Sequence, residues 1–474
     1  MSKRKDKVRV ELVGKSGDGV TGSMYYITFS DKQILLDAGL YQTSSDDILN
    51  QYKVNRRNYK VPFSELDAVI ISHCHIDHIG LVPYLFKRGY RGNVYVPSKT
   101  KYLAKIMWED SLKIFQSDCL KLERRYGIKA ESLYEQEDIE MAYEHLVELP
   151  FNEEIVLFDN LTLCFYHAAH IVNAAQVRLI FKIGETIKSL NYTGDIGSDI
   201  DKDYILPYQS MPYADAVIAE STYGGSNKSH KQKDRNKDIE KIKTVINQCC
   251  QENTKKVVFG SFSLQRTQEI LTELYKIYGD DKTFSTPILV DAPLAKKICN
   301  VWDKVIEKDN DLWKKVMSWT NIEWVDTSED SAAWQKLKTS QVVISTSNFL
   351  KAGRILGWLK SILPDADNRL CFCGYSGDEQ SVAYQIQHNK RWVEVDGVRV
   401  SNKANVVCLN SFSSHACQKE LLQRYTDMPY NKIYLVHGEK NGKTEFAKKL
   451  RESLERADRS AKVHTPVMGD KFEF

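Results

Sequence analysis

The chain of 474 residues is too long for one simple hydrophobic core, so we expect two domains or one domain with a large insertion. Its hydrophobic (42%) and charged (27%) fractions fit a soluble globular enzyme, and the formal net charge of +3 neither demands nor excludes a polyanionic partner. The ten cysteines include no CxxC pair, which indicates reduced thiols in a cytosolic protein and argues against a disulfide framework.

The sequence shows no membrane or export signal. No run approaches the roughly 18 apolar residues that a bilayer-spanning helix needs. The basic start is not followed by an apolar segment, so no signal peptide is expected. We therefore predict a cytoplasmic protein without membrane attachment.

The first predicted elements are strands over residues 8–13, 24–29 and 33–37, with a glycine-rich turn over residues 14–23. The glycine spacing does not fit a phosphate-binding P-loop, so antiparallel strands with a glycine-rich connection are the better interpretation. Asp37 ends the third strand, where a carboxylate can reach an active site. Taken alone, this aspartate is better explained as a turn cap.

The next segment concentrates potential metal ligands. Four of them fall within six positions: His73, His75, Asp77 and His78. They follow residues 66–71, which indicate a buried parallel strand, and a helix is predicted to begin near residue 80. Open α/β sheets place their chemistry where a strand ends and a helix follows. Imidazole and carboxylate suit zinc or manganese, so the sequence predicts a metal site here.

The remaining elements predict two α/β patterns. Residues 100–147 are helical in character, and strands return at 155–158, 161–166, 176–183, 190–192 and 214–219. A polar stretch over residues 227–238 is a candidate boundary. Beyond it, strands at 256–259, 288–290, 342–345 and 370–373 alternate with helices at 265–278, 294–307 and 350–362, which indicates a smaller α/β domain. After about residue 404 the first pattern resumes, with strands at 405–409 and 432–436 and a helix at 443–457.

Acidic or imidazole residues follow several of these strands. They are His170, Asp195, Glu220, His415 and His437. Singly, each is more often a hydrogen-bonded turn or core residue. Together with the cluster at residues 73–78, they supply the about seven ligands, one of them a bridging carboxylate, that a two-metal hydrolase needs.

The order and spacing of short motifs along nearly the whole chain resemble the β-CASP branch of the metallo-β-lactamase superfamily. The similarity is to its RNA-processing type, related to the endonuclease subunit of the cleavage and polyadenylation specificity factor and its prokaryotic homologues. The motifs lie at residues 20–23, 36–39, 72–78, 169–171, 192–195, 220–224, 262–269, 291–295, 411–415 and 435–439. The resemblance implies an α/β fold: an αββα sandwich formed by residues 1–212 and 405–474, with a β-CASP α/β cap domain inserted as residues 213–404.

The resemblance also implies a metal centre. His73, His75 and His170 would hold one zinc, and Asp77, His78 and His437 the other, with Asp195 bridging the two. Asp37 would orient a ligand histidine from behind. The implied cofactors are two Zn²⁺, with Mn²⁺ as the alternative. Two dications roughly 3.5–4 Å apart can share a hydroxide and clamp a phosphodiester for in-line attack.

Three further residues carry catalytic roles by the same resemblance. Asp77 would orient the hydroxide as well as bind metal. His415, supported by Glu220, would stabilise the phosphorane charge or protonate the departing oxygen. His437 stands where DNA-processing members usually carry an aliphatic residue, which favours RNA as the substrate.

The sequence also departs from the usual family pattern. Cys417 stands where an aspartate usually follows Ser-Ala-His-Ala, so support of His415 through that aspartate is absent. The cap motifs at residues 346–349 and 379–383 are altered as well. These changes leave the substrate and the mode of cleavage open.

The substrate is expected in a cleft between core and cap. Candidate phosphate contacts are Arg266, Lys351 and Arg354, and candidate stacking residues are Tyr223 and Tyr375. Each is as readily explained as a solvated or packed side chain. We predict a di-zinc ribonuclease that cuts single-stranded RNA, with endo- or exonuclease mode and homodimer formation left open. The alternatives are a catalytically altered RNA-binding scaffold of the same family and a metallo-hydrolase of DNA or a small molecule.

Overall fold

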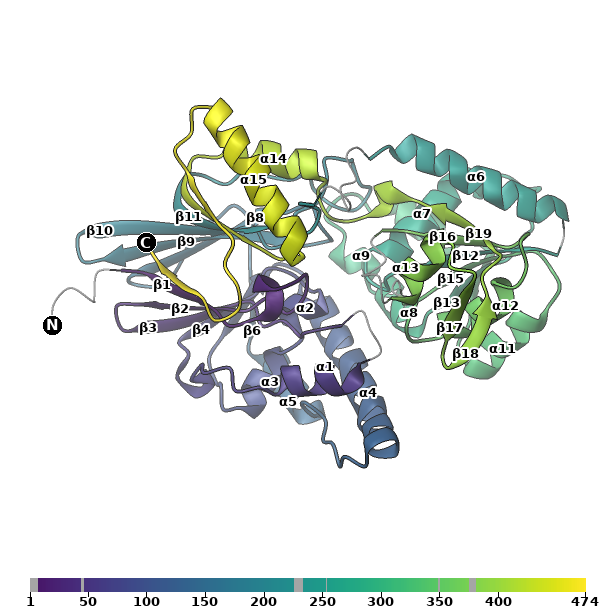
Figure 1. The fold of residues 1–474 in the computed structure, drawn as a ribbon, viewed down its shortest axis with the longest axis horizontal. Coiled ribbons are helices and arrows are strands. Elements are labelled where there is room, and N and C mark those ends of the chain that lie inside the picture. Colours follow the sequence, from purple (N-terminus) through teal and green to yellow (C-terminus); the bar gives the residue numbers. More distant parts are fainter. Residues whose placement is uncertain (1–6, 44–46, 226–232, 253, 348–349, 375–380) are drawn as a thin grey trace. The chain divides into compact units, whose positions relative to one another are not determined.

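The computed structural model describes residues 7–43, 47–225, 233–252, 254–347, 350–374 and 381–474 (Figure 1). They form two compact units. The first takes in the described residues before 226 together with Ser414–Phe474, and the second takes in Lys233–Ser413. The chain therefore leaves the first unit, builds the second, and returns.

The first unit is built on two seven-stranded sheets. The first sheet has the order β22 (Lys471–Glu473), β1 (Arg9–Leu12), β2 (Tyr25–Phe29), β3 (Lys32–Leu36), β4 (Ala68–Ile70), β5 (Val94–Pro97), β6 (Leu146–Leu149). The second has the order β21 (Lys462–His464), β20 (Tyr430–Val436), β11 (Ala214–Glu220), β10 (Thr186–Tyr192), β9 (Ala175–Ile183), β8 (Leu161–His167), β7 (Ile155–Phe158). One hydrophobic cluster joins residues from both sheets.

Apolar and polar side chains alternate along strands of the two sheets, and the apolar ones form this core. In β9, Val177, Leu179 and Phe181 are fully buried in the shared cluster, whereas Lys182 points outward and is exposed. Strand β4 is buried on both faces, because helices cover the side of the first sheet that faces away from the second sheet.

Helices cover the outer face of each sheet in the first unit (Figure 1). On the side of the first sheet are α1 (Ile48–Asn55), α2 (Ile76–Ile79), α3 (Val82–Lys87), α4 (Lys101–Tyr126) and α5 (Gln136–Glu144). On the side of the second sheet are α14 (Gln418–Asp427) and α15 (Lys440–Arg456). The predicted αββα sandwich is confirmed. The helical stretch expected over residues 100–147 is interrupted, because Gly127 ends α4 in a left-handed conformation (φ +67°).

The second unit is a parallel α/β layer. Its six-stranded sheet has the order β14 (Ile322–Trp324), β13 (Ile288–Asp291), β15 (Gln341–Ser345), β12 (Lys256–Gly260), β16 (Arg369–Phe372), β19 (Asn405–Cys408). A separate hairpin joins β17 (Trp392–Val395) and β18 (Val398–Ser401). The helices are α6 (Arg235–Glu252), α7 (Arg266–Tyr278), α8 (Pro293–Cys299), α9 (Trp302–Val305), α10 (Asp311–Met317), α11 (Ser328–Lys336), α12 (Ile355–Ile362) and α13 (Val382–Gln387). The predicted α/β character of this part of the chain is confirmed.

The first division of the chain lies close to the polar stretch over residues 227–238, whereas the bounds implied by the resemblance, at residues 213 and 405, differ from those of the compact units. Strand β11, expected to open the cap at residue 213, pairs in parallel with β10 and β20 of the first unit. Strand β19, expected to reopen the core at residue 405, pairs in parallel with β16 of the second unit. An apolar run joins whichever sheet offers it a partner, and the sequence pattern does not identify that partner. The division instead falls between Gly225 and Lys233 and between Ser413 and Ser414.

Neither a membrane span nor a disulfide is found in the described part of the chain. None of its helices combines the length and apolar character needed to cross a bilayer. All ten cysteines are described and are free thiols, most of them buried. Burial raises the pKa of Cys299 to about 12, which keeps this thiol protonated.

Candidate metal centre

The segment between β4 and α2 carries four of the predicted ligands on a short stretch of chain. His73 and His75 lie two residues apart before the helix. The backbone of His75, which caps the N-terminus of α2, is extended. Asp77 and His78 then lie in the first turn of α2. The four side chains contribute to two neighbouring groups of donors, which residues at or just beyond the ends of other strands complete.

A first group of donors forms around His75. Its Nδ1 lies 3.2 Å from Nε2 of His73 and 3.1 Å from Nε2 of His170. Oδ2 of Asp195 lies 3.8 Å from Nε2 of His73 and 3.7 Å from Nε2 of His170. These four residues can share one metal ion.

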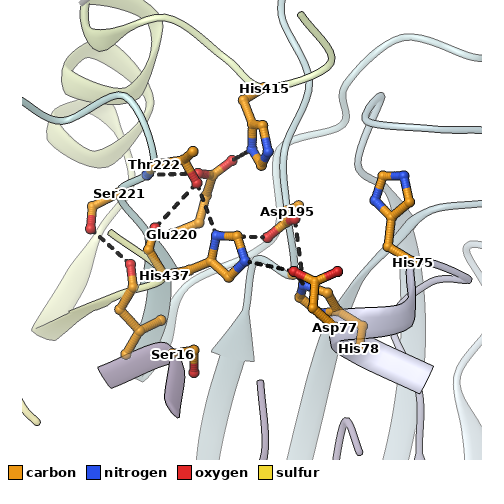
Figure 2. A network of polar contacts seen from close by, with 12 residues as sticks. Ser16, His75, Asp77, His78, Asp195, Glu220, Ser221, Thr222, His415 and His437 are labelled. Atoms are coloured by element: carbon orange, nitrogen blue, oxygen red, sulfur yellow. Dashed lines mark hydrogen bonds and ion pairs between the residues drawn. The ribbon is translucent and has the colours of Figure 1, made fainter. Parts of the chain in front are cut away.

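A second group lies on the other side of Asp195 (Figure 2). The same Oδ2 of Asp195 lies 3.4 Å from Nε2 of His78. Oδ2 of Asp77 lies 3.3 Å from Nε2 of His437 and 3.8 Å from Nε2 of His78. Asp195 therefore belongs to both groups, which is the arrangement of a bridging carboxylate.

The donor set fits divalent metal ions. Nε2 of His78 and Oδ1 of Asp195 are buried without a hydrogen-bond partner, and such groups are costly unless another partner satisfies them. Burial lowers the pKa of His73 and His170, and it lowers the pKa of His75 to about 4. These rings are therefore neutral at pH 7, which is the form that binds a metal.

The carboxylates are charged in the same surroundings. Burial alone would raise the pKa of Asp195, but the imidazoles of His437 and His78 hold it well below its usual value. Burial also opposes ionisation of Asp77, and His78 and His437 again lower its pKa. The cluster thus combines three neutral imidazoles, those of His73, His75 and His170, with anionic carboxylates. Against the opposing effect of burial, the same carboxylates raise the pKa of His78 and His437, so these two rings must release a proton when a metal ion binds. Imidazole and carboxylate donors suit zinc or manganese.

Asp37 lies behind one of the ligand histidines. Its Oδ2 is 2.7 Å from Nδ1 of His78 and accepts hydrogen bonds from the hydroxyls of Ser72 (2.8 Å) and Tyr192 (2.7 Å). Its Oδ1 accepts from the backbone N–H of Ser72 at 2.7 Å. Because Asp37 engages Nδ1, the Nε2 atom of His78 faces Asp195. The contact fixes the orientation of the ring.

Two glycines let backbone segments pack against the ligand-bearing segments. A Cβ atom at Gly39 would lie 1.7 Å from the carbonyl oxygen of Asp77, and one at Gly197 would lie 1.7 Å from that of Ala169. Neither distance is sterically allowed. The glycines following Asp37 and Asp195 are thus required by the close approach of the chain next to Asp77 and His170.

Glu220 and His415 form a pair beside the metal ligands (Figure 2). Glu220 is fully buried at the end of β11, and its Oε1 lies 3.1 Å from Nδ1 of His415 and accepts from the backbone N–H of Ile196 at 2.9 Å. The ring of His415 lies 4.5 Å from that of His170, centroid to centroid. The structure therefore places this imidazole directly beside the donor cluster.

Thr222 is a positioning residue to which the sequence argument gave no role. Its hydroxyl lies 2.9 Å from Nδ1 of His437, and its backbone N–H donates to Oε2 of Glu220 at 3.0 Å. With Nδ1 held by Thr222, the Nε2 atom of His437 faces Asp77. The motif Glu220-Ser221-Thr222 was visible in the sequence, but the partner of its threonine lies 215 residues away.

Replacing Thr222 with valine is expected to weaken metal binding at the group containing His437 by about tenfold, because the ring loses the contact that orients it. The measurement is a titration of metal-depleted protein with Zn²⁺. Thr222→Ser keeps the hydroxyl and should bind metal almost as wild type does. Equal affinities for Thr222→Val and wild type would contradict the assigned role.

Two buried lysines hold the backbone around the ligands. The Nζ atom of Lys202 donates to the carbonyl oxygens of Ala169 (2.7 Å) and His170 (3.2 Å). The Nζ atom of Lys443 donates to the carbonyl oxygens of Gly17 and Pro466. The neighbouring Ser16 accepts a hydrogen bond from the backbone N–H of His437 at 2.7 Å. The glycine-rich turn thus anchors the segment that carries His437.

Cys417 caps a helix. It precedes α14, and its backbone N–H donates to Oε2 of Glu420 at 2.6 Å in a capping box. The support of His415 described here comes from Glu220, so the absence of an aspartate at position 417 leaves that contact intact. This departure from the family pattern therefore leaves the contact between Glu220 and His415 in place.

Most of the predicted substrate contacts have partners inside the protein. Arg266 is 3% exposed and pairs with Glu269 at 2.7 Å. Arg354 pairs with the buried Asp291 at 2.8 Å and donates to the carbonyl oxygen of Val325. These ion pairs argue against the predicted phosphate contacts of the two arginines.

The tyrosines and Lys351 give no support either. Tyr223 is 1% exposed and lies edge-on to His415, so it offers no open face to a base. Lys351 is half-buried and has contacts of its own. Tyr375 lies outside the described residues.

Comparison with known families gives three matches along the chain. Residues 17–157 match the metallo-β-lactamase superfamily, residues 267–386 the Beta-Casp domain, and residues 399–466 the Zn-dependent metallo-hydrolase RNA specificity domain. A solved structure of a protein of unknown function from Enterococcus faecalis covers 99% of this chain and 100% of its own, with a TM-score of 0.52 at 11% identity. This last similarity concerns the fold alone.

Relatives matched over most of this chain carry the family assignment. Ribonuclease TTHA0252 of Thermus thermophilus is 32% identical over 432 residues, covering 89% of this chain and 91% of the relative. Transcription termination factor FttA of Methanocaldococcus jannaschii is 25% identical over 94% of this chain and 69% of its own length. Integrator complex subunit 11 of Danio rerio is 26% identical over 93% and 70%. The chain therefore belongs to the β-CASP family of the metallo-β-lactamase superfamily and is a metal-dependent hydrolase.

Proposed function

We propose that this protein is a zinc-dependent ribonuclease that hydrolyses phosphodiester bonds of single-stranded RNA. The observation that carries the proposal is the convergence of seven histidine and aspartate side chains into two groups that share Asp195. A phosphodiester is an anion and a poor electrophile. Two adjacent cations neutralise its charge and make its phosphorus more electrophilic.

The proposed cofactors are two Zn²⁺ ions, with Mn²⁺ as the alternative. The residues that would hold them are His73, His75, His170 and Asp195 for one ion and Asp77, His78, His437 and Asp195 for the other. When bound, these ions would neutralise charge that develops on the phosphate and lower the pKa of a water molecule toward 7.

The protein's own residues would orient the reacting groups. The Asp77 carboxylate, kept ionised by its neighbours, can accept a hydrogen bond from the attacking water. The Glu220 carboxylate accepts from Nδ1 of His415, which places the transferable proton on Nε2. His415 would donate that proton to the departing oxygen as a general acid.

RNA is the proposed substrate on two grounds. The relatives bear the names of a ribonuclease, a transcription termination factor and an Integrator subunit, and residues 399–466 match an RNA specificity domain. His437 also occupies the position at which DNA-processing members usually carry an aliphatic residue. A cytoplasmic location and homodimer formation remain expectations from the sequence.

The proposal is tested with single-stranded RNA and DNA labelled at the 5′ or 3′ end, incubated with wild type and the Asp77→Ala variant. Wild type should bind about two metal ions per chain and cut RNA in preference to DNA. Asp77→Ala should lose cleavage. Asp159→Ala, which removes an exposed carboxylate in the turn between β7 and β8, is the matched control and should cleave as wild type does.

The results separate two kinds of failure. If wild type binds stoichiometric metal but cuts neither nucleic acid, the nuclease proposal is wrong. If purified wild type neither contains nor takes up metal, the assignment of the site is wrong. The label that is released first also distinguishes internal cleavage from degradation from one end.

A further inference from the structure

The hairpin of β17 and β18 is the only sheet of the second unit, among the described residues, that lies outside its six-stranded sheet. Its two-residue turn, Asp396-Gly397, has positive φ at both residues (+50° and +71°), as the tight turns that match strand twist require. Val393, Val395 and Val400 are buried in the hydrophobic cluster of this unit. One face of the hairpin is therefore anchored, and the other is presented outward.

The outward face carries an exposed indole. Trp392 is 39% exposed and is the only exposed tryptophan in the described part of the chain. The guanidinium of Arg399 lies 4.9 Å from the centre of its ring. In the strand register Arg399 stands opposite Glu394, yet no ion pair joins these two residues. The guanidinium lies over the diagonal Trp392, which is the geometry of a cation–π contact.

Two further cations lie at the open end of the hairpin. Arg391 precedes β17, Lys403 follows β18, and a hydrogen bond from the N–H of Asn402 to the carbonyl of Arg391 (3.0 Å) brings the two strand ends together. The side chains of Arg391, Arg399 and Lys403 are exposed, and none of them forms a hydrogen bond or ion pair with a described residue. By contrast, Lys360 and Asp396 pair with each other at 2.8 Å.

This combination has the chemistry of a single-strand binding surface. A base can stack on an open aromatic face irrespective of its identity, while cations beside it neutralise the phosphates. Surfaces that bind protein are also enriched in tryptophan and arginine, but their cores bury contiguous apolar area. Here the exposed apolar area is one indole with Val398 (49% exposed). The unpaired side chains of the hairpin and its ends are three cations, Arg391, Arg399 and Lys403, against one carboxylate, Glu394, so their net charge is positive.

We propose that Trp392 and Arg399, with Arg391 and Lys403, form a binding surface for single-stranded RNA on the β17–β18 hairpin. A base stacks on the indole, and the guanidinium and ammonium groups bind the flanking phosphates. The inference rests on the proposed ribonuclease function, because it names a second contact for the same substrate. It concerns binding, and it assigns no chemical step to the hairpin.

The first test measures cleavage of a long single-stranded RNA by the metal-loaded full chain. Trp392→Ala should raise KM about tenfold and leave kcat unchanged, because stacking contributes to affinity alone. Trp392→Phe keeps an aromatic face and should retain most of the affinity. Arg399→Glu should raise KM further and flatten its dependence on salt concentration. Lys338→Glu, the same charge change at another exposed residue of this unit, should behave as wild type.

The second test uses tryptophan fluorescence with an oligouridine strand. Binding should quench part of the emission of wild type, and Trp392→Ala should lose this quench. A thermal melt of each variant checks the fold, and the outward position of Trp392 predicts a Tm within a few degrees of wild type.

The outcomes distinguish this inference from the proposed function. If wild type cuts RNA while Trp392→Ala and Arg399→Glu keep the wild-type KM and quench, the hairpin assignment is overturned and the nuclease stands. If wild type cuts no RNA but oligouridine quenches Trp392, the hairpin assignment stands and the nuclease fails. If Trp392→Ala converts a dimer to a monomer without changing KM for RNA, the surface joins two copies of the chain and the RNA assignment is overturned.

Discussion

Replacing Asp195 with asparagine is expected to deplete metal from both groups and to lower RNA cleavage by about a thousandfold or more. The reason is that one carboxylate oxygen lies close to the donors of both groups. Oδ2 of Asp195 lies within 3.8 Å of the Nε2 atoms of His73, His170 and His78, so a single substitution removes a donor from both groups. An amide keeps the shape of the side chain but not the negative charge that offsets two cations.

The measurement pairs metal analysis of the purified protein with single-turnover cleavage of labelled RNA. Asp215→Asn is the matched control. Asp215 is on β11 and is half-buried, and it accepts a hydrogen bond from the backbone N–H of Ser189 at 2.8 Å, away from the metal ligands. That variant should keep both metal and activity. An Asp195→Asn protein with full metal content and wild-type cleavage would show that the two groups do not share this carboxylate.

Much of the fold follows from the sequence because the strands carry strong patterns. Strand β4 is a continuous apolar run, and β9 alternates, so each indicates how many of its faces are buried. The pairing of strands is less readable. Strands β11 and β19 have the expected character, but each pairs in the unit opposite to the one that the implied bounds at residues 213 and 405 give it, since pairing depends on partners far along the chain.

The β17–β18 hairpin shows a signal that was present and unused. Valines at 393, 395, 398 and 400 flank Asp396-Gly397, a combination that favours a two-residue hairpin. No element was predicted over residues 392–401. Local turn chemistry would have found both the hairpin and the exposed tryptophan on it.

The donor cluster could be named residue by residue, whereas the contacts that orient it could not. Each ligand after His78 stands at the end of a strand or just beyond it, where polar residues are conspicuous after an apolar run. Thr222, Lys202 and Lys443 act through backbone atoms or ring nitrogens of residues far away in the sequence. The backbone at Ala169 (φ +57°) and His437 (φ +48°) is also left-handed, and the residue types at these positions do not predict that conformation.

The ion pairs of the two arginines predicted to contact phosphate were hidden in the sequence for a related reason. From the sequence alone, an arginine that forms an ion pair inside the protein cannot be distinguished from one that is free to bind a phosphate. Arg266 forms an ion pair with Glu269, one helical turn away, and Arg354 forms one with Asp291 at the end of β13. Arg391 and Arg399, which form no ion pair with a described residue, lie in a segment without a recognisable motif.

Removing the imidazole of His415 is the second substitution with a large expected effect. His415→Ala should lower kcat by about 10²- to 10⁴-fold, the usual contribution of a general acid, while the metal content stays that of wild type. Glu220→Gln should lower kcat by at least about tenfold, because an amide no longer fixes the Nδ1 proton. His388→Ala, an exposed histidine stacked on Tyr384, is the matched control and should be neutral.

The double variant decides whether these residues act as one unit. If Glu220 works only through His415, then Glu220→Gln adds nothing once His415 is alanine, and the two effects are strongly non-additive. Additive losses would give Glu220 a separate role, through Ile196 or Thr222. The metal content of each variant must be measured as well, because Asp195, Glu220 and His415 also lie close enough together to hold an ion. Loss of metal in His415→Ala would make His415 a ligand, whereas slow cleavage with full metal content makes it the proton donor.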